Sequence, residues 1–153
     1  MPVFISYRHT DRASALAIND RLQREQITTY LDVLDAESRT TDDITQVIST
    51  HIRACTHLIA LVSKNTSQSW WVPFEIGEAT IIDRRISTFQ AGEADLPEYL
   101  EKWPIMRTAR DIDLFVTSYR LEKTLSRAIV GNESFESTTS SRSNADKFHA
   151  DLK

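Results

Sequence analysis

Short apolar runs alternate with amphipathic stretches along the first 130 residues of the chain. Apolar or β-branched runs predict strands, and apolar residues that recur every three or four positions predict helices. The predicted strands cover residues 3–6, 27–33, 58–62 and 86–89, with a short strand near Ile105. The predicted helices are one capped by Asp11, one after residues 41–43, and two over about residues 70–84 and 111–130. This alternation predicts an α/β fold with a central parallel sheet and helices on both faces.

The composition changes after residue 130. Residues 131–153 are rich in Ser and Thr and contain few apolar side chains, which is typical of flexible segments. We therefore expect a domain over residues 1–130 and a tail over residues 131–153. Within the tail, we expect a flexible linker over residues 131–144 and a short docking helix over residues 144–152.

Composition also argues against several classes of protein. The chain has 153 residues and a formal net charge of −4, and an acidic protein is poorly suited to binding a nucleic-acid backbone. The longest purely apolar run, residues 58–62, is far shorter than the ~20 residues of a membrane span. The first residues show no secretory signal. The single cysteine, Cys55, cannot form an internal disulfide, so we expect a cytoplasmic protein.

The chain contains only three glycines, Gly77, Gly92 and Gly131. They cannot form the glycine-rich fingerprint of a dinucleotide-binding fold, a P-loop or the nucleophile elbow of a hydrolase. Any nucleotide that binds here is therefore held by side chains of another kind.

The most informative candidate segment is residues 69–78, which follow the third predicted strand. Ligands of parallel α/β sheets bind at the carboxyl ends of the strands. Pro73 fits the first turn of a helix, and on that helix Trp71, Glu75 and Glu78 share one face. We expect a second face to be buried against the domain; it carries Trp70, Phe74, Gly77 and Ile81.

A carboxylate beside an aromatic ring suits a substrate that develops positive charge, as in cleavage of an N-glycosidic bond. At an effective dielectric of ~20, a carboxylate about 4 Å from a unit positive charge is worth ~4 kcal/mol, or roughly a thousandfold in rate. The alternative interpretation is that Glu75 and Glu78 are solvated helix residues and that the tryptophans belong to the core. Spacing alone does not decide between the two.

A weaker candidate is the group His51, Cys55 and His57. These residue types bind metals, but the three span a helix end and a strand start. We expect structural roles for them and no metal site, with Cys55 as a small core residue.

Three motifs in register resemble a known family. Residues 3–8, VFISYR, followed by Asp11, resemble the opening box of a TIR (Toll/interleukin-1 receptor) domain. Residues 30–33, YLDV, resemble the second strand of the family, and Ser69, Trp71 and Glu75 match its S-x-W-x-x-x-E pattern. The resemblance covers about residues 2–130. It implies a flavodoxin-like three-layer TIR fold.

The resemblance implies an enzyme that cleaves the nicotinamide–ribose bond of NAD⁺ with Glu75, and forms ADP-ribose, a cyclised isomer or a conjugate. NAD⁺ is then the substrate, and no separate cofactor is implied. The substrate-binding residues would be Phe4, Tyr7, Arg8 and Trp71, with Arg8 meeting phosphate. Four further residues would lie close behind them: His9, Asp11, Asp35 and Glu78. The loop over residues 34–41 lacks the glycine and proline that many relatives carry there.

Family members commonly act as assemblies, so the resemblance also implies association with other TIR protomers, through a surface that includes residues 34–42. The chain begins at the first predicted strand. If it is the whole protein, it resembles the stand-alone TIR subunits of bacterial Thoeris anti-phage systems, whose product activates a separate effector. Two alternatives stay open: a non-catalytic TIR interaction module, and an enzyme like the nucleoside deoxyribosyltransferases, which have a related fold.

Overall fold

The computed structural model of the chain describes residues 1–31, 44–66, 69, 71–130 and 148–152. The chain forms two compact units, Met1–Arg107 and Thr108–Lys153. The first unit contains the sheet and its covering helices, and the second contains the long helix that follows them.

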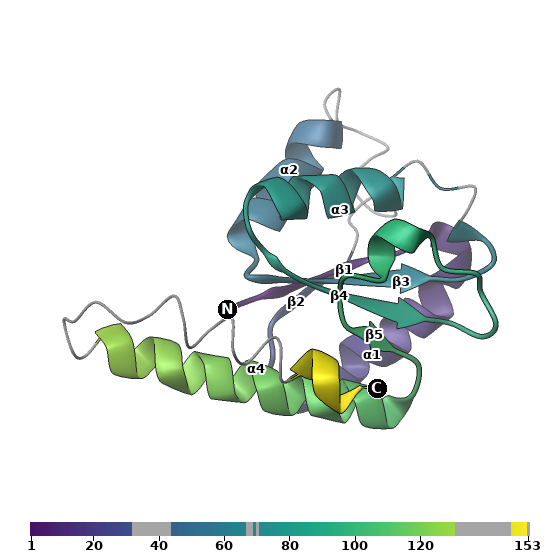
Figure 1. Cartoon of the computed structure of the whole chain (residues 1–153). Coiled ribbons are helices and arrows are strands. Elements are labelled where there is room, and N and C mark those ends of the chain that lie inside the picture. The colour runs from purple at the N-terminus through teal and green to yellow at the C-terminus, as the bar shows by residue number, and fades with distance from the viewer. Residues whose placement is uncertain (32–43, 67–68, 70, 131–147, 153) are drawn as a thin grey trace. The chain divides into compact units, whose positions relative to one another are not determined.

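The first unit is built on a five-stranded sheet (Figure 1). Its strands are β1 (Val3–Ser6), β2 (Thr29–Leu31), β3 (His57–Val62), β4 (Arg85–Gln90) and β5 (Ile105–Met106). They lie in the order β2-β1-β3-β4-β5, and each neighbouring pair is parallel. This is the flavodoxin-like order, in which the strand order reverses between β1 and β3. The parallel α/β sheet predicted from the alternation is confirmed.

Helices cover both faces of this sheet, giving three layers. Helix α1 (Arg12–Arg24) lies on one face, and α2 (Ile44–Ala54) and α3 (Trp71–Ile81) lie on the other (Figure 1). We call these the α1 face and the α3 face. The α3 face carries a buried core of Phe4, Leu58, Ala60, Val62 and Ile86 from the strands, and Ile48, Ile52, Val72, Ile76 and Ala79 from the helices. Successive strand residues point to opposite faces, so Val3, Ile5, Ile59 and Leu61 point to the α1 face.

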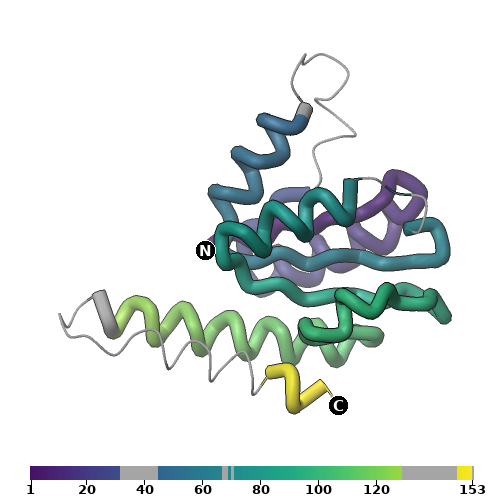
Figure 2. The backbone as a smooth tube through the Cα atoms, turned by 45° about the horizontal axis from the view of Figure 1, so that its top comes forward, coloured from purple at the N-terminus to yellow at the C-terminus, as the bar shows by residue number. Residues whose placement is uncertain are grey.

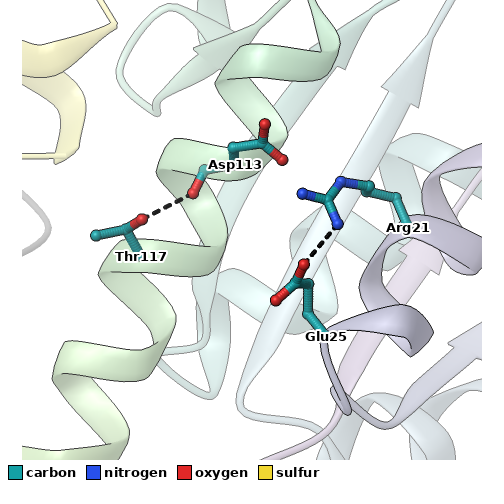
Figure 3. A network of polar contacts seen from close by, with 4 residues as sticks. All are labelled: Arg21, Glu25, Asp113 and Thr117. Carbon is teal, nitrogen blue, oxygen red and sulfur yellow. Dashed lines mark hydrogen bonds and ion pairs between the residues drawn. The ribbon is translucent and has the colours of Figure 1, made fainter.

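Helix α1 begins after Asp11 as expected, but the Asp11 side chain does not cap it. Its carboxylate accepts hydrogen bonds from the loop after β3 instead. At the end of α1, Arg21 forms an ion pair with Glu25, the residue that follows the helix, with an Nη1–Oε1 distance of 2.6 Å (Figure 3). This pair is one helical turn apart and only partly exposed.

Helices α1 and α3 end in the same way. After α1, the amides of Gln26 and Ile27 donate to the carbonyls of Gln23 and Leu22, and Gln26 has a φ of 59°. After α3, the amides of Asp83 and Arg84 donate to the carbonyls of Thr80 and Ala79, and Asp83 has a φ of 54°. Both ends are Schellman motifs, in which a left-handed residue is normally glycine. This glycine-poor chain uses Gln and Asp there.

The second unit contains α4 (Ala109–Val130) and a helical turn at residues 148–151. Along α4, the Thr117 hydroxyl donates to the Asp113 carbonyl at 2.9 Å (Figure 3). The ring of Phe148 packs edge-on against that of Phe115, with 5.9 Å between centroids. Among the described residues, no helix is both long and apolar enough to span a membrane. The division at residue 130 stays a prediction, because residues 131–147 lie outside the described part of the chain.

Candidate functional site

Hydrogen bonds join the loops that follow β1 and β3 at the carboxyl edge of the sheet. The Arg8 guanidinium donates through Nη1 to the Asn65 carbonyl at 2.5 Å. The Asp11 carboxylate accepts hydrogen bonds from the Ser63 hydroxyl at 2.6 Å and from the side-chain amide nitrogen of Asn65 at 3.1 Å. Arg8 and Asp11, both sequence-predicted site residues, therefore lie together at the point where the strand order reverses. Neither Ser63 nor Asn65 was named as a site residue from the sequence, although both closely follow a buried strand, where ligands of parallel sheets bind.

The remaining predicted residues of the β1 region differ in exposure. Phe4 is completely buried in the α3-face core, and Tyr7, just past the strand, is buried as well. His9 is exposed, in a 3₁₀ turn before α1. Asp35 lies outside the described residues. Phe4 is thus a core side chain in this structure, and the polar groups of this loop are supplied by Arg8 and Asp11.

The helix that carries Glu75 is buried along a different face from the one expected. Its buried residues are Val72, Glu75, Ile76 and Ala79. The face expected to be buried carries Gly77, which is exposed, and Ile81, which is 83% exposed. Phe74 is half-buried, and Trp70 lies outside the described residues. The prediction for that face is therefore wrong, because α3 is apolar on nearly every side and its periodicity does not single out one stripe.

Glu75 is the one carboxylate among the buried side chains of the described residues, and it is 0% exposed. Both of its carboxylate oxygens are buried. Its place on the stripe with Val72, Ile76 and Ala79 directs it toward the sheet. Burial of a carboxylate costs free energy, and the stability of the domain does not require a carboxylate here. Glu75 is therefore a strong candidate for a functional group.

The other two predicted residues of α3 lie beside this stripe. Trp71 is half-buried and packs against Phe74, with 6.0 Å between ring centroids and an interplanar angle of 86°. Glu78 is half-buried. Trp71 and Glu75 are one turn apart, so the structure keeps the aromatic ring and the carboxylate on adjacent parts of the helix.

A cavity of about 490 Å³ opens at the carboxyl edge of the sheet, beside the first turn of α3. Three segments line it: the last residue of β3 with the loop that follows, the first turn of α3, and the segment after β4. The lining residues are Val62, Ser63, Lys64, Thr66, Ser69, Val72, Pro73, Glu93, Asp95, Pro97, Tyr99 and Leu100. Of the described residues that the sequence analysis names individually, Ser69 and Pro73 line it. Sequence reasoning missed the part from residues 93–100, which has neither strand nor helix periodicity.

His51, Cys55 and His57, the residues weighed as metal ligands, each contact different neighbours. The ring of His51 packs edge-on against Tyr30, and the His57 ring contacts the Thr56 hydroxyl at 2.9 Å. Cys55 belongs to the α3-face core, and burial raises the pKa of its thiol to about 11. Its thiol is therefore protonated at neutral pH. Within the described ranges, no three His, Cys, Asp or Glu residues are grouped as metal ligands would be.

The sheet order, the layers and the polar groups at the strand ends define a flavodoxin-like α/β domain with a candidate ligand site at its carboxyl edge. The family model of the TIR domain matches residues 3–127. The chain therefore belongs to the TIR-domain family, as its motifs indicate.

Solved structures agree with this fold. The chain is similar to the TIR domain of the Toll-related receptor TRR-2 from the lower metazoan Hydra magnipapillata, with a TM-score of 0.63 and 15% identity over 79% of this chain and 95% of that one. It is also similar to a 2-deoxyribosyltransferase from Bacillus psychrosaccharolyticus, with a TM-score of 0.63 and 8% identity over 73% of this chain and 90% of that one. No curated protein matches the chain. At these identities, the structural likeness concerns the fold alone.

Proposed function

We propose that this TIR domain cleaves NAD⁺ at the bond between nicotinamide and ribose, with Glu75 as the catalytic carboxylate. The observation that carries the proposal is the complete burial of Glu75 on the sheet-facing stripe of α3. Membership of a family whose catalytic members use a glutamate at this motif position supports the assignment. The matching Ser69 and Trp71 complete the motif.

In the proposed reaction, the bond between the ribose C1′ and the pyridinium nitrogen breaks. The bonding electron pair leaves with nicotinamide, and the ribose acquires oxocarbenium character. An ionised Glu75 stabilises this positive charge by ~4 kcal/mol at about 4 Å and an effective dielectric of ~20. Water then adds to C1′ and loses a proton, giving ADP-ribose. Attack by an adenine nitrogen of the same molecule gives a cyclised isomer, and attack by another acceptor gives a conjugate.

The residues around Glu75 are proposed to hold the substrate. Trp71 and Phe4 contribute walls, and Tyr7 lies at the strand end beside them. Arg8 is proposed to meet a phosphate, because a guanidinium offers several donors in one plane. His9, Asp35 and Glu78 are proposed to lie behind these groups, and Asp11 positions the loop through Ser63 and Asn65.

Access to Glu75 requires a change from this structure, because both carboxylate oxygens are buried. We therefore expect the isolated protomer to be nearly silent and the activity per protomer to rise with protein concentration. Assembly with other TIR protomers is the proposed cause, with residues 34–42 as part of the contact. A cytoplasmic role in anti-phage defence, in which the product activates a separate effector, completes the proposal and rests on the resemblance to Thoeris TIR proteins.

The test measures nicotinamide released from NAD⁺ at increasing protein concentration, with mass spectrometry of the other product. Glu75→Gln keeps the shape of the side chain and removes its charge, so we expect a loss of roughly a thousandfold. Glu78→Gln, one turn further along α3, is expected to lose less than tenfold. Glu101→Gln, at an exposed position, controls for removal of a surface charge. Equal losses at Glu75 and Glu78 would contradict the assignment.

A second candidate function is nucleoside deoxyribosyl transfer, since the chain shares its fold with a 2-deoxyribosyltransferase at a TM-score of 0.63. Incubation with a deoxynucleoside and a different free base tests it, because transfer yields a new nucleoside. Base exchange that depends on Glu75, without nicotinamide release from NAD⁺, would favour this function. The absence of both reactions would favour a non-catalytic interaction module.

A further inference from the structure

Two hydroxyl groups are buried on the α3 face of the sheet, in the same layer as Glu75. Ser6 and Thr88 are each 0% exposed. Within the described part of the chain, neither hydroxyl oxygen has a hydrogen-bond partner. A buried hydroxyl without a partner costs free energy, and native proteins keep few of them outside functional sites. These two groups therefore need an explanation.

The strand register places both hydroxyls in one row. Ser6 of β1 pairs with Ala60 of β3, and Ala60 pairs with Thr88 of β4. Side chains of such partners stand on the same face of the sheet. Ala60 belongs to the core on the α3 face, so Ser6 and Thr88 face α3 as well. Ala60, which lies between the two hydroxyls in this row, carries only a methyl group.

The geometry of α3 places Glu75 above this row. Helix α3 returns along the sheet, from the carboxyl ends of the strands toward their amino ends (Figure 2). Val72 and Val62 both line the cavity at the carboxyl edge, so both lie near that end of the sheet. Glu75 is about 4.5 Å further along the helix axis, and Ala60 is about 6.6 Å back along its strand. Glu75 and Ala60 are therefore set back from the carboxyl edge by similar distances, which places Glu75 near the row of Ser6, Ala60 and Thr88.

We propose that Ser6 and Thr88 are positioning residues for Glu75. With substrate bound, their hydroxyls donate hydrogen bonds to the carboxylate, keep it ionised and aim it at the ribose C1′. A hydroxyl hydrogen rotates to suit its acceptor, and a hydrogen bond to a charged oxygen is stronger than one between neutral groups. Among the described residues the two hydroxyls have no hydrogen-bond partner, so these bonds form on the way to the active arrangement. The inference rests on the proposed cleavage of NAD⁺ by Glu75.

The experiment compares kcat and KM for NAD⁺ cleavage in Ser6→Ala, Thr88→Val and Thr88→Ser. Ser6→Ala and Thr88→Val are each expected to lower kcat about tenfold, the order of one hydrogen bond to a charged group, with KM unchanged. Thr88→Ser keeps the hydroxyl and is expected to restore most of kcat. Ser87→Ala is the matched control: Ser87 is a buried neighbour on β4 that points to the opposite face, and its removal leaves kcat unchanged.

Each outcome decides the inference. If the wild-type protein releases no nicotinamide, the proposed function and this inference both fail. If the wild-type protein is active and Ser6→Ala and Thr88→Val keep full kcat, only the positioning role fails. A loss of kcat that Thr88→Ser does not restore, or that accompanies a lower urea midpoint, indicates a structural role and overturns the inference as well.

Discussion

The two faces of the sheet differ in the hydrogen bonding of their buried polar side chains. On the α1 face, Asn19 is 6% exposed, and both its amide oxygen and its amide nitrogen form hydrogen bonds. The Asn19 amide oxygen accepts from the Thr29 hydroxyl at 2.5 Å and from the Gln23 amide at 3.4 Å, and its amide nitrogen donates to Asp20 at 3.3 Å. These bonds join α1 to β2, so Asn19 stabilises the packing of the helix on the sheet.

On the α3 face, Ser6 and Thr88 are buried without hydrogen-bond partners in the described structure, and the Glu75 carboxylate is buried in the same layer. Buried polar groups of this kind lower stability and are kept where function needs them. The difference teaches that the described polar groups on the α1 face stabilise helix packing, whereas the α3 face carries buried polar groups that stability does not explain.

Matched substitutions of a buried polar residue on each face give the largest expected effect on stability. Asn19→Ala removes the acceptor of the Thr29 hydroxyl, so we expect the free energy of unfolding to fall by about 1–3 kcal/mol. Thr88→Val replaces an unpartnered hydroxyl with a methyl group of similar size. We expect it to leave the free energy unchanged or raise it by up to about 1 kcal/mol. Urea unfolding measures both.

The same measurement could reverse the comparison. If Thr88→Val destabilises the protein as much as Asn19→Ala, the Thr88 hydroxyl has a partner in solution and the two faces are alike. Ser87→Ala again serves as control, because it removes a hydroxyl from the same strand on the opposite face.

Much of the fold could be predicted from the sequence because strand patterns are local. The strand at Val3–Ser6 was predicted with its observed bounds, and the apolar run at 58–62 forms all but the first residue of β3. Both strands are buried along their whole length. A strand buried on both faces is recognised as a continuous apolar run, without alternation of apolar and polar residues. The second strand begins at Thr29, two residues later than its β-branched and aromatic composition indicated, and residues 32 and 33 of the predicted run lie outside the described residues.

The site was harder to predict because it depends on contacts between distant segments. Glu75 was identified from its motif, but its burial was not, since the apolar residues of α3 surround the helix. Ser6 is the polar residue that ends an apolar strand, and this position was the available signal for a buried hydroxyl. Thr88 gave no such signal, because Thr is common in strands. Its place beside Ala60 follows only from the register of β3 and β4.

A titration tests the core of the α3 face through Cys55. Burial raises the pKa of the Cys55 thiol from an ordinary value of 9.0 to about 11. The unfolded thiol therefore ionises first, and its contribution to stability is complete below pH 9 and is lost as the pH rises toward 11. The loss amounts to at most about 1.4 kcal/mol per pH unit in that window. Urea unfolding at pH 8, 9, 10 and 10.5 measures it.

Cys55→Ala is the reference for this titration, because the small apolar residue cannot ionise. Burial also raises the pKa of Tyr99 and Tyr119, but these residues are present in both proteins and cancel in the difference. As the pH rises from 9 to 10.5, the free energy of unfolding of the wild-type protein should fall relative to that of Cys55→Ala. Parallel curves would show that the thiol is solvated and that this core is looser than described.

The smallest expected effect concerns the ends of α1 and α3, which are alike although the helices lie on opposite faces. Gln26 and Asp83 both have positive φ, a conformation that costs a residue with a Cβ about 1 kcal/mol relative to glycine. Gln26→Gly and Asp83→Gly are therefore each expected to raise the free energy of unfolding by about 0.5–1 kcal/mol. Gly92→Ala should have the opposite sign, because Gly92 has a φ of +66° and open space around a Cβ. If both substitutions raise the free energy of unfolding equally, the two faces differ only in their buried polar groups. If only Gln26→Gly raises it, the backbone at the end of α3 is constrained as well as the Glu75 side chain.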